Sequence, residues 1–189
     1  FFSPLQNDPP HPDATHIFLP GGYPELFAET LSKKTKFIKA MQKATQSADT
    51  IYGECGGFMV MGQSIIDADN HPHKMCAILP ATTSIAHKKR VLGYRQISFA
   101  DPSLNLKSHA SKMRHEARIN GPQSLWRGHE YHYASLVEPT KNAQNISPMV
   151  YVSDLYNQHA WAGMQHFITQ KNGAKTRQIG SFIHFIERV

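Results

Sequence analysis

The sequence is poor in cysteine and lacks any long hydrophobic run. Cys55 and Cys76 are the two cysteines among 189 residues, too few for the disulfide framework of a small secreted protein. A membrane-spanning helix would need about 18 or more consecutive apolar residues, and no such run occurs. Residues 1–4 have neither the basic nor the apolar region of a signal peptide. These absences predict a soluble, cytoplasmic protein with no membrane partner.

Clustered charge and a phosphate-binding loop are also missing. The formal net charge is +6, but the basic residues are spread along the chain and match no nucleic-acid-binding motif. We therefore expect no nucleic-acid partner, although a positive field also suits a small substrate with carboxylates. The pattern Gly-x-x-x-x-Gly-Lys-Ser/Thr is absent, so we expect this chain to bind no ATP through a P-loop and to hold no cofactor of its own.

The first third of the chain has the pattern of an α/β domain. Residues 15–19 and 50–52 are short β-prone runs, and each is followed by glycines and then by a helical spacing of apolar residues. Parallel strands need such crossover connections. The length and the 40% hydrophobic content fit a single domain over residues 1–189.

The rest of the chain is predicted to be rich in β-structure. Its β-prone runs lack a helical spacing and alternate with turn residues. We expect strands at residues 74–80, 90–99, 113–119, 131–137, 149–153, 160–164 and 179–186. We expect loops at residues 67–70, 101–103 and 142–147.

Cys55 lies in a Gly-x-Cys-x-Gly motif at a predicted strand-to-helix turn, which is the arrangement of a nucleophile elbow. The helix that follows would favour the thiolate and lower the pKa of Cys55 below its reference value of about 8.5. The amide of Gly56 is a candidate oxyanion donor, and the turn containing Gly22 could supply a second. The alternative is an ordinary buried cysteine. Cys76, in an apolar stretch without glycines, fits that alternative.

A thiolate nucleophile needs a base, and the chain has twelve histidines. His184 follows a β-prone run near the chain end, where its imidazole could face Cys55. The rival segment is residues 127–132, which contains His129 and His132. These two are three residues apart in a β-like context, whereas the zinc-helix motif needs a spacing of four. We therefore expect no metal site.

Five motifs occur in this order and with similar spacing in cobyrinic acid a,c-diamide synthases of the CobB/CobQ type, and the chain resembles this family over nearly its whole length. The motifs are LPGGYPEL at residues 19–26, YGECGGFM at 52–59, LGYR at 92–95, RGHEYHY at 127–133 and GSFIH at 180–184.

The resemblance implies a flavodoxin-like class I glutamine amidotransferase domain, with a mostly parallel central sheet flanked by helices and a β-rich middle section. It implies that Cys55 attacks the side-chain amide of glutamine, forms a thioester and releases ammonia, with His184 as the base. Many class I amidotransferases carry a glutamate two residues after the histidine. That position is Ile186 here, so we expect a Cys-His dyad. Motif membership makes four residues candidates for glutamine binding: Tyr23, Glu54, Arg127 and His129.

Family members also carry an N-terminal ATP-dependent amidoligase domain, which this chain lacks. ATP and Mg²⁺ are expected in that domain, where the a and c carboxylates of cobyrinate or hydrogenobyrinate would be activated. The chain would then be a fragment or a separate subunit that supplies ammonia to its corrinoid-binding partner. Whether the chain forms a homodimer is left open by the sequence. Two alternatives stay open beside this function: another cysteine hydrolase of the same fold, and a non-catalytic amidotransferase-like binding domain.

Overall fold

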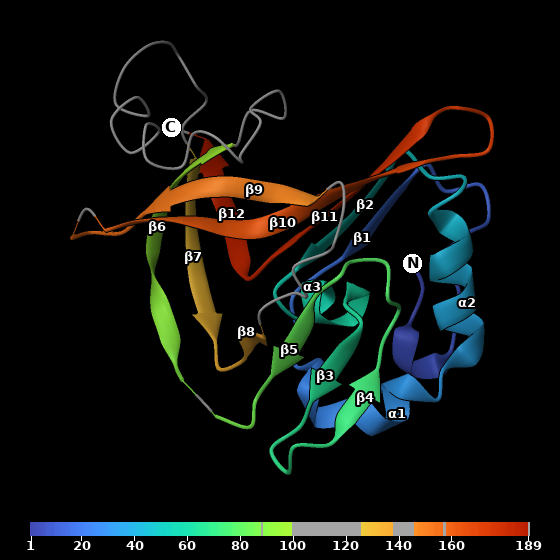
Figure 1. Ribbon diagram of the computed structural model, residues 1–189, viewed down its shortest axis with the longest axis horizontal. Coiled ribbons are helices and arrows are strands. Elements are labelled where there is room, and N and C mark those ends of the chain that lie inside the picture. Colours follow the sequence, from blue (N-terminus) through green and yellow to red (C-terminus); the bar gives the residue numbers. More distant parts are fainter. Residues whose placement is uncertain (88, 100–125, 138–145, 157, 189) are drawn as a thin grey trace.

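The computed structural model describes residues 1–87, 89–99, 126–137, 146–156 and 158–188. Two sheets organise these residues (Figure 1). The larger has eight strands in the order β1-β2-β11-β10-β9-β6-β7-β12, and the smaller has four in the order β4-β3-β5-β8.

The N-terminal part has the expected α/β alternation. After the 3₁₀ turn η1 (Pro4–Gln6), strand β1 (His16–Leu19) pairs in parallel with β2 (Thr50–Glu54). Proline and glycine end β1 at Pro20, as predicted. The crossover between the two strands consists of η2 (Pro24–Phe27), α1 (Ala28–Ser32) and α2 (Thr35–Ala44).

Only part of the large sheet is parallel. β11 (Lys175–Ser181) lies on the other side of β2 and is parallel to it. The remaining pairs are antiparallel and involve β10 (His159–Thr169), β9 (Ile146–Ser153), β6 (Val91–Phe99), β7 (Trp126–His132) and β12 (Ile183–Arg188). The α/β class is confirmed, but the expected mostly parallel, helix-flanked sheet is wrong for this half. In the described residues after β5, no helix provides the crossovers that parallel strands require.

The large sheet curls on itself (Figure 1). A cluster of buried side chains from β6, β9, β11 and β12 packs together with Tyr52 of β2 and Trp126 of β7. Side chains from both ends of the strand order can meet only on the concave side of a curled sheet. This curl brings β12, the last strand in the order, close to β2 and to the turn after β1.

The smaller sheet covers the helix that follows β2. It is formed by β4 (Pro72–Lys74), β3 (Ser64–Ile66), β5 (Thr82–Ser84) and β8 (Ser135–Val137). Helix α3 (Gly56–Met61) contacts β1, β2 and β11 on one side and β3 on the other, and all six of its residues are buried. The main hydrophobic core therefore surrounds the segment that begins at the nucleophile candidate.

Several strand predictions need correction. Residues 75–80 form no strand; β4 ends at Lys74, and the apolar side chains that follow are buried in the core without strand pairing. The run at 131–137 is broken between β7 and β8, the run at 179–186 is broken at Phe182, and residues 146–147 belong to β9. The expected strand at 113–119 and the loops at 101–103 and 142–145 lie outside the described residues. In the part of the chain that the structure describes, no helix is long and apolar enough to cross a membrane.

Candidate active site

Cys55 stands between the end of β2 and the start of α3, as the motif predicts. Its backbone has φ 50° and ψ −107°, a conformation that costs a non-glycine residue on the order of 1–3 kcal/mol. Its amide donates to the carbonyl oxygen of Ser181 at 2.7 Å, which ties the turn to the end of β11. The thiol lies 3.9 Å from the carbonyl oxygen of Tyr131, at the end of β7. The strained turn thus holds the sulfur where three strands end.

The glycines of the two turns allow these segments to approach each other. A Cβ atom on Gly56 would overlap the carbonyl oxygen of Gly22, and one on Gly57 would overlap the carbonyl oxygen of Leu19. The close approach brings the amides of Gly22 and Gly56 near the sulfur of Cys55, where both favour its negative charge. Two backbone donors converging on a nucleophile are the components of an oxyanion hole.

The predicted lowering of the pKa of Cys55 is wrong. Burial raises the pKa of the thiol; the hydrogen bond from Gly56 opposes this, the negative charges of Glu25 and Glu54 raise the pKa further, and the amide of Gly22 lowers it. Only 7% of the residue is exposed. The free site therefore favours a neutral thiol, which needs a base to become a nucleophile.

His184 lies in β12 and is held by contacts from three other segments. Its Nδ1 atom is 2.7 Å from Oε1 of Glu54, the residue directly before Cys55. Its ring stacks on that of His129, with centroids 4.9 Å apart and an interplanar angle of 26°. On another side, a Cβ atom built on Gly21 would sit 2.5 Å from its Cε1 atom. The imidazole is therefore fixed between the neighbours of Cys55 and Gly22.

Glu54 and Tyr52 point to the same side of β2, as expected for residues two apart in a strand. The hydroxyl of Tyr52 donates to Oε2 of Glu54 at 3.0 Å. Burial, together with the charge and the hydrogen bond of Glu54, raises the pKa of Tyr52. Both carboxylate oxygens of Glu54 thus have partners. Tyr52 is not among the site residues predicted from the sequence, although its spacing from Glu54 was a usable signal.

The four glutamine-binding candidates are not gathered at one point. Tyr23 is 57% exposed and follows Gly22 directly, so it lies at the edge of the site. His129 is beside His184, and its Nδ1 atom is buried without a hydrogen-bond partner among the described residues. Arg127 lies two residues before His129 in β7 and pairs with Glu187 at 3.0 Å, with both side chains more than half exposed. The structure brings Glu54 and His129 to His184, but Arg127 faces another partner.

A family comparison decides what kind of domain carries this site. The model described as the CobB/CobQ-like glutamine amidotransferase domain matches residues 1–188. The chain belongs to this family. The resemblance based on the five motifs is thereby confirmed.

Relatives of this amidotransferase domain are longer proteins. It is 36% identical over 188 residues to the hydrogenobyrinate a,c-diamide synthase of Rhizobium meliloti (strain 1021), covering 99% of this chain and 37% of that protein. For the synthase of the same name from Rhodobacter capsulatus, the identity is 33% over 185 residues, covering 98% of this chain and 36% of that protein. The chain therefore spans little more than a third of the length of these relatives. A crystal structure of a glutamine amidotransferase shows a weak similarity, with a TM-score of 0.49 and 12% identity over 90% of this chain and 70% of that one.

An apolar cavity of about 640 Å³ borders the candidate active site. Gly22, Tyr23 and Gly56 line one side of it, and Phe2, Leu26 and Val60 are among its other walls. Cys55 does not line this cavity. Glutamine carries an ammonium and a carboxylate at one end, and charged groups need polar partners. This cavity therefore does not have the polar lining that free glutamine requires.

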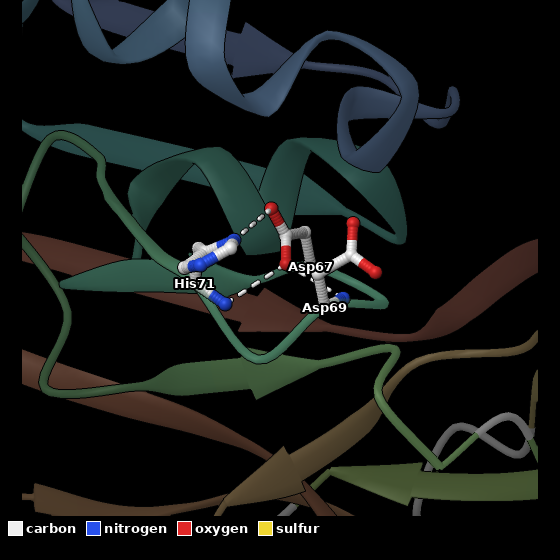
Figure 2. A group of neighbouring side chains, drawn as sticks. All are labelled: Asp67, Asp69 and His71. Atoms are coloured by element: carbon white, nitrogen blue, oxygen red, sulfur yellow. Dashed lines mark hydrogen bonds and ion pairs between the residues drawn. The ribbon is translucent and has the colours of Figure 1, made fainter.

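Among the described residues, the structure brings together one group of potential metal ligands that is not predicted from the sequence. Asp67, Asp69 and His71 lie in the turn between β3 and β4 (Figure 2). The carboxylate of Asp67 accepts hydrogen bonds from the amides of Asp69 and His71, both at 2.9 Å, and lies 2.7 Å from Nε2 of His73. These hydrogen bonds stabilise the turn and explain why the three side chains lie close together.

Proposed function

We propose that this domain hydrolyses glutamine through a thioester on Cys55. In this proposal the ammonia is used by an ATP-dependent amidoligase region to amidate the a and c carboxylates of hydrogenobyrinate. The observation that carries it is the convergence of the Gly22 and Gly56 amides on the sulfur of a strained strand-to-helix turn. A buried structural cysteine such as Cys76 has no need of that geometry.

The first half of the reaction consumes the amide of glutamine. As glutamine enters, Nε2 of His184 accepts the thiol proton of Cys55, and the sulfur attacks the side-chain carbonyl carbon. Charge develops on the carbonyl oxygen, next to the sulfur, and the amides of Gly22 and Gly56 are suited to stabilise it. The imidazolium then protonates the leaving nitrogen. The carbon–nitrogen bond breaks, ammonia leaves, and a glutamyl thioester remains.

The second half regenerates the thiol. His184 accepts a proton from water, whose oxygen attacks the thioester carbonyl, and the same two amides stabilise the second oxyanion. The carbon–sulfur bond breaks, Cys55 recovers a proton from His184, and glutamate leaves. This cycle needs no metal or cofactor in this domain; ATP and Mg²⁺ belong to the proposed amidoligase region.

The names of the relatives support the choice of acceptor. The two relatives described above are both hydrogenobyrinate a,c-diamide synthases, and this chain corresponds to little more than a third of each. We therefore propose hydrogenobyrinate rather than cobyrinate, with the amidoligase region in the same polypeptide or in a partner subunit. A cytoplasmic location is part of the proposal, since Cys55 and Cys76 are both free thiols.

The test combines glutamine hydrolysis with mass analysis of the acceptor. With the amidoligase region present, Cys55→Ala should abolish glutamine hydrolysis, while Cys76→Ala should retain it. The Cys55→Ala protein should still amidate hydrogenobyrinate when ammonium salts replace glutamine. Undiminished glutaminase activity in Cys55→Ala would refute the nucleophile. Preferential amidation of cobyrinate would refute the acceptor.

A glutamine-analogue diazoketone separates this function from the other cysteine hydrolases. It should label Cys55 stoichiometrically, with protection by glutamine. Labelling without protection by glutamine would favour a hydrolase with another substrate. A failure of Cys55 to react while the protein is folded and joined to its amidoligase region would favour a non-catalytic binding domain.

A further inference from the structure

The carboxylate that contacts the catalytic histidine candidate comes from an unexpected place. Oε1 of Glu54 is 2.7 Å from Nδ1 of His184, and the two side chains are 15% and 24% exposed. The contact joins residues 130 positions apart and depends on the curl of the large sheet. Glu54 also directly precedes Cys55, so a single turn would position both the nucleophile and the partner of its base.

The tautomer of His184 follows from this contact. A carboxylate accepts hydrogen bonds, so Glu54 favours the proton on Nδ1 and leaves the lone pair on Nε2. A base for the thiol of Cys55 needs that lone pair. When the imidazole takes the proton, the carboxylate also stabilises the resulting positive charge. The second oxygen of Glu54 is held by Tyr52, which fixes the carboxylate in turn.

We propose that Glu54 is the positioning residue for His184 and that Tyr52 holds Glu54 in place. This inference rests on the proposed function and completes a Cys-His-Glu arrangement in which the glutamate precedes the cysteine. It also replaces the expectation that Glu54 binds glutamine, because both of its oxygens already have protein partners.

Other described carboxylates have different partners. Glu187, three residues after His184, bonds to Arg127 at 3.0 Å on the surface. Glu130, the neighbour of His129 in β7, bonds to Arg95 at 2.6 Å. Among the residues that the structure describes, the carboxylate paired with His184 is that of Glu54. Glu187 is therefore a matched control.

Steady-state kinetics of glutamine hydrolysis by the complete protein test the role. We expect Glu54→Gln to lower kcat by about 10²–10⁴-fold, the usual range when acid–base catalysis is lost, with KM changed less than about threefold. Glu54→Asp should lie between Glu54→Gln and wild type, since a carboxylate remains but is one methylene shorter. Tyr52→Phe should show a smaller loss of kcat, and Glu187→Gln should match wild type.

A spectroscopic readout separates positioning from a purely structural role. In protein with ¹⁵N-labelled histidine, the His184 signals, assigned by comparison with His184→Ala, should show that the neutral imidazole carries its proton on Nδ1 and not on Nε2. Glu54→Gln should change this distribution, because its amide can also donate to Nδ1. Glu187→Gln should leave it as in wild type.

The outcomes separate this inference from the proposed function. Wild-type kcat in Glu54→Gln, a raised KM with unchanged kcat, or an unprotonated Nδ1 in wild type would overturn the role of Glu54, even with Cys55→Ala inactive. Full activity in Cys55→Ala would instead overturn the proposed function. If Glu54→Gln does not fold, the kcat of Glu54→Asp and Tyr52→Phe decides, and wild-type values in both would overturn the role.

Discussion

Gly21 and His184 lie so close that a Cβ atom on Gly21 would sit 2.5 Å from Cε1 of the imidazole. Gly21 has no positive φ, so its backbone accepts alanine and the side chain of His184 must move instead. We expect Gly21→Ala to fold normally but to lose about 10²-fold in kcat for glutamine hydrolysis, the order of magnitude for a displacement near 1 Å. Thermal unfolding and steady-state kinetics measure the two effects separately.

Gly22→Ala provides the comparison for Gly21→Ala. A Cβ atom there meets nothing within 4 Å, and alanine keeps the backbone amide that points to the sulfur. Its loss of kcat should be clearly smaller than that of Gly21→Ala. Equal kcat values in the two variants would contradict a role in catalysis for the close approach of Gly21 to the imidazole of His184.

The raised pKa of Cys55 predicts that its alkylation has a midpoint at high pH. Because burial and the charges of Glu25 and Glu54 keep the thiol protonated, its labelling by iodoacetamide should rise with pH at a midpoint above the ordinary thiol pKa of about 8.5. Glu25→Gln removes one negative charge and should move the midpoint to lower pH. Mass analysis of the labelled peptides at a series of pH values gives the midpoint.

Two internal comparisons belong to the alkylation experiment. Glu29, one helical turn after Glu25, is exposed and pairs with Lys33, so Glu29→Gln should leave the midpoint unchanged. Cys76 is fully buried with its pKa raised by burial to about 12, and it should stay unlabelled in the native protein. A wild-type midpoint below about 8.5 would contradict the raised pKa of Cys55.

The sequence predicted the local structure of the candidate catalytic segment better than its surroundings. The elbow at Cys55 follows from local glycine spacing, and the strand-turn-helix geometry agrees with it. The direction of the pKa shift was wrong, because burial of the sulfur and the position of Glu25 depend on packing that local spacing does not encode. Likewise, the contact of Glu54 with His184 depends on how the sheet curls, and the hydrophobic periodicity of the sequence does not indicate this curl.

The prediction of a mostly parallel sheet was wrong where the described residues between strands contain no crossover helix. Two strand-to-helix steps near the N-terminus predicted parallel pairing, and β1, β2 and β11 obey it. Extending that pattern to the rest of the sheet was wrong, since β6, β7, β9 and β10 pair antiparallel. Residues 74–80 and 90–99 both carry strand-like residues among polar and turn residues, but of these two segments it is the second that forms a long strand.

Gly57 is predicted to be important for the stability of the fold. A Cβ atom on it would overlap the carbonyl oxygen of Leu19, and backbone atoms cannot rotate away as a side chain can. We expect Gly57→Ala to lower the free energy of unfolding by at least about 1–3 kcal/mol, the usual cost of overpacking. Gly22→Ala should change it by less than about 0.5 kcal/mol. Urea unfolding curves of both variants check this, and equal midpoints would contradict it.

The ion pair between Arg95 and Glu130 is mostly buried and should contribute to stability in a pH-dependent way. The side chains are 17% and 14% exposed, with Nη2 and Oε2 2.6 Å apart. Burial alone would raise the pKa of Glu130, but the nearby imidazole of His132, 3.8 Å away, and the charge of Arg95 outweigh it and hold the pKa below its ordinary value of 4.5. A lowered pKa in the folded state means that the stabilisation is present above about pH 4.5 and is lost as the pH falls below it.

Replacing the cation of this pair tests the dependence. Arg95→Met leaves a buried carboxylate without its charge partner and should lower the free energy of unfolding by about 3–5 kcal/mol at pH 7. The deficit should shrink toward pH 4, where Glu130 in the variant can take up a proton. Arg127→Met, in β7, removes the exposed pair with Glu187 of β12 and should lower the free energy of unfolding by less than about 1 kcal/mol. Urea unfolding at pH 7 and pH 4 measures both variants, and a deficit for Arg95→Met that is the same at the two pH values would show that the charge of Glu130 does not cause it.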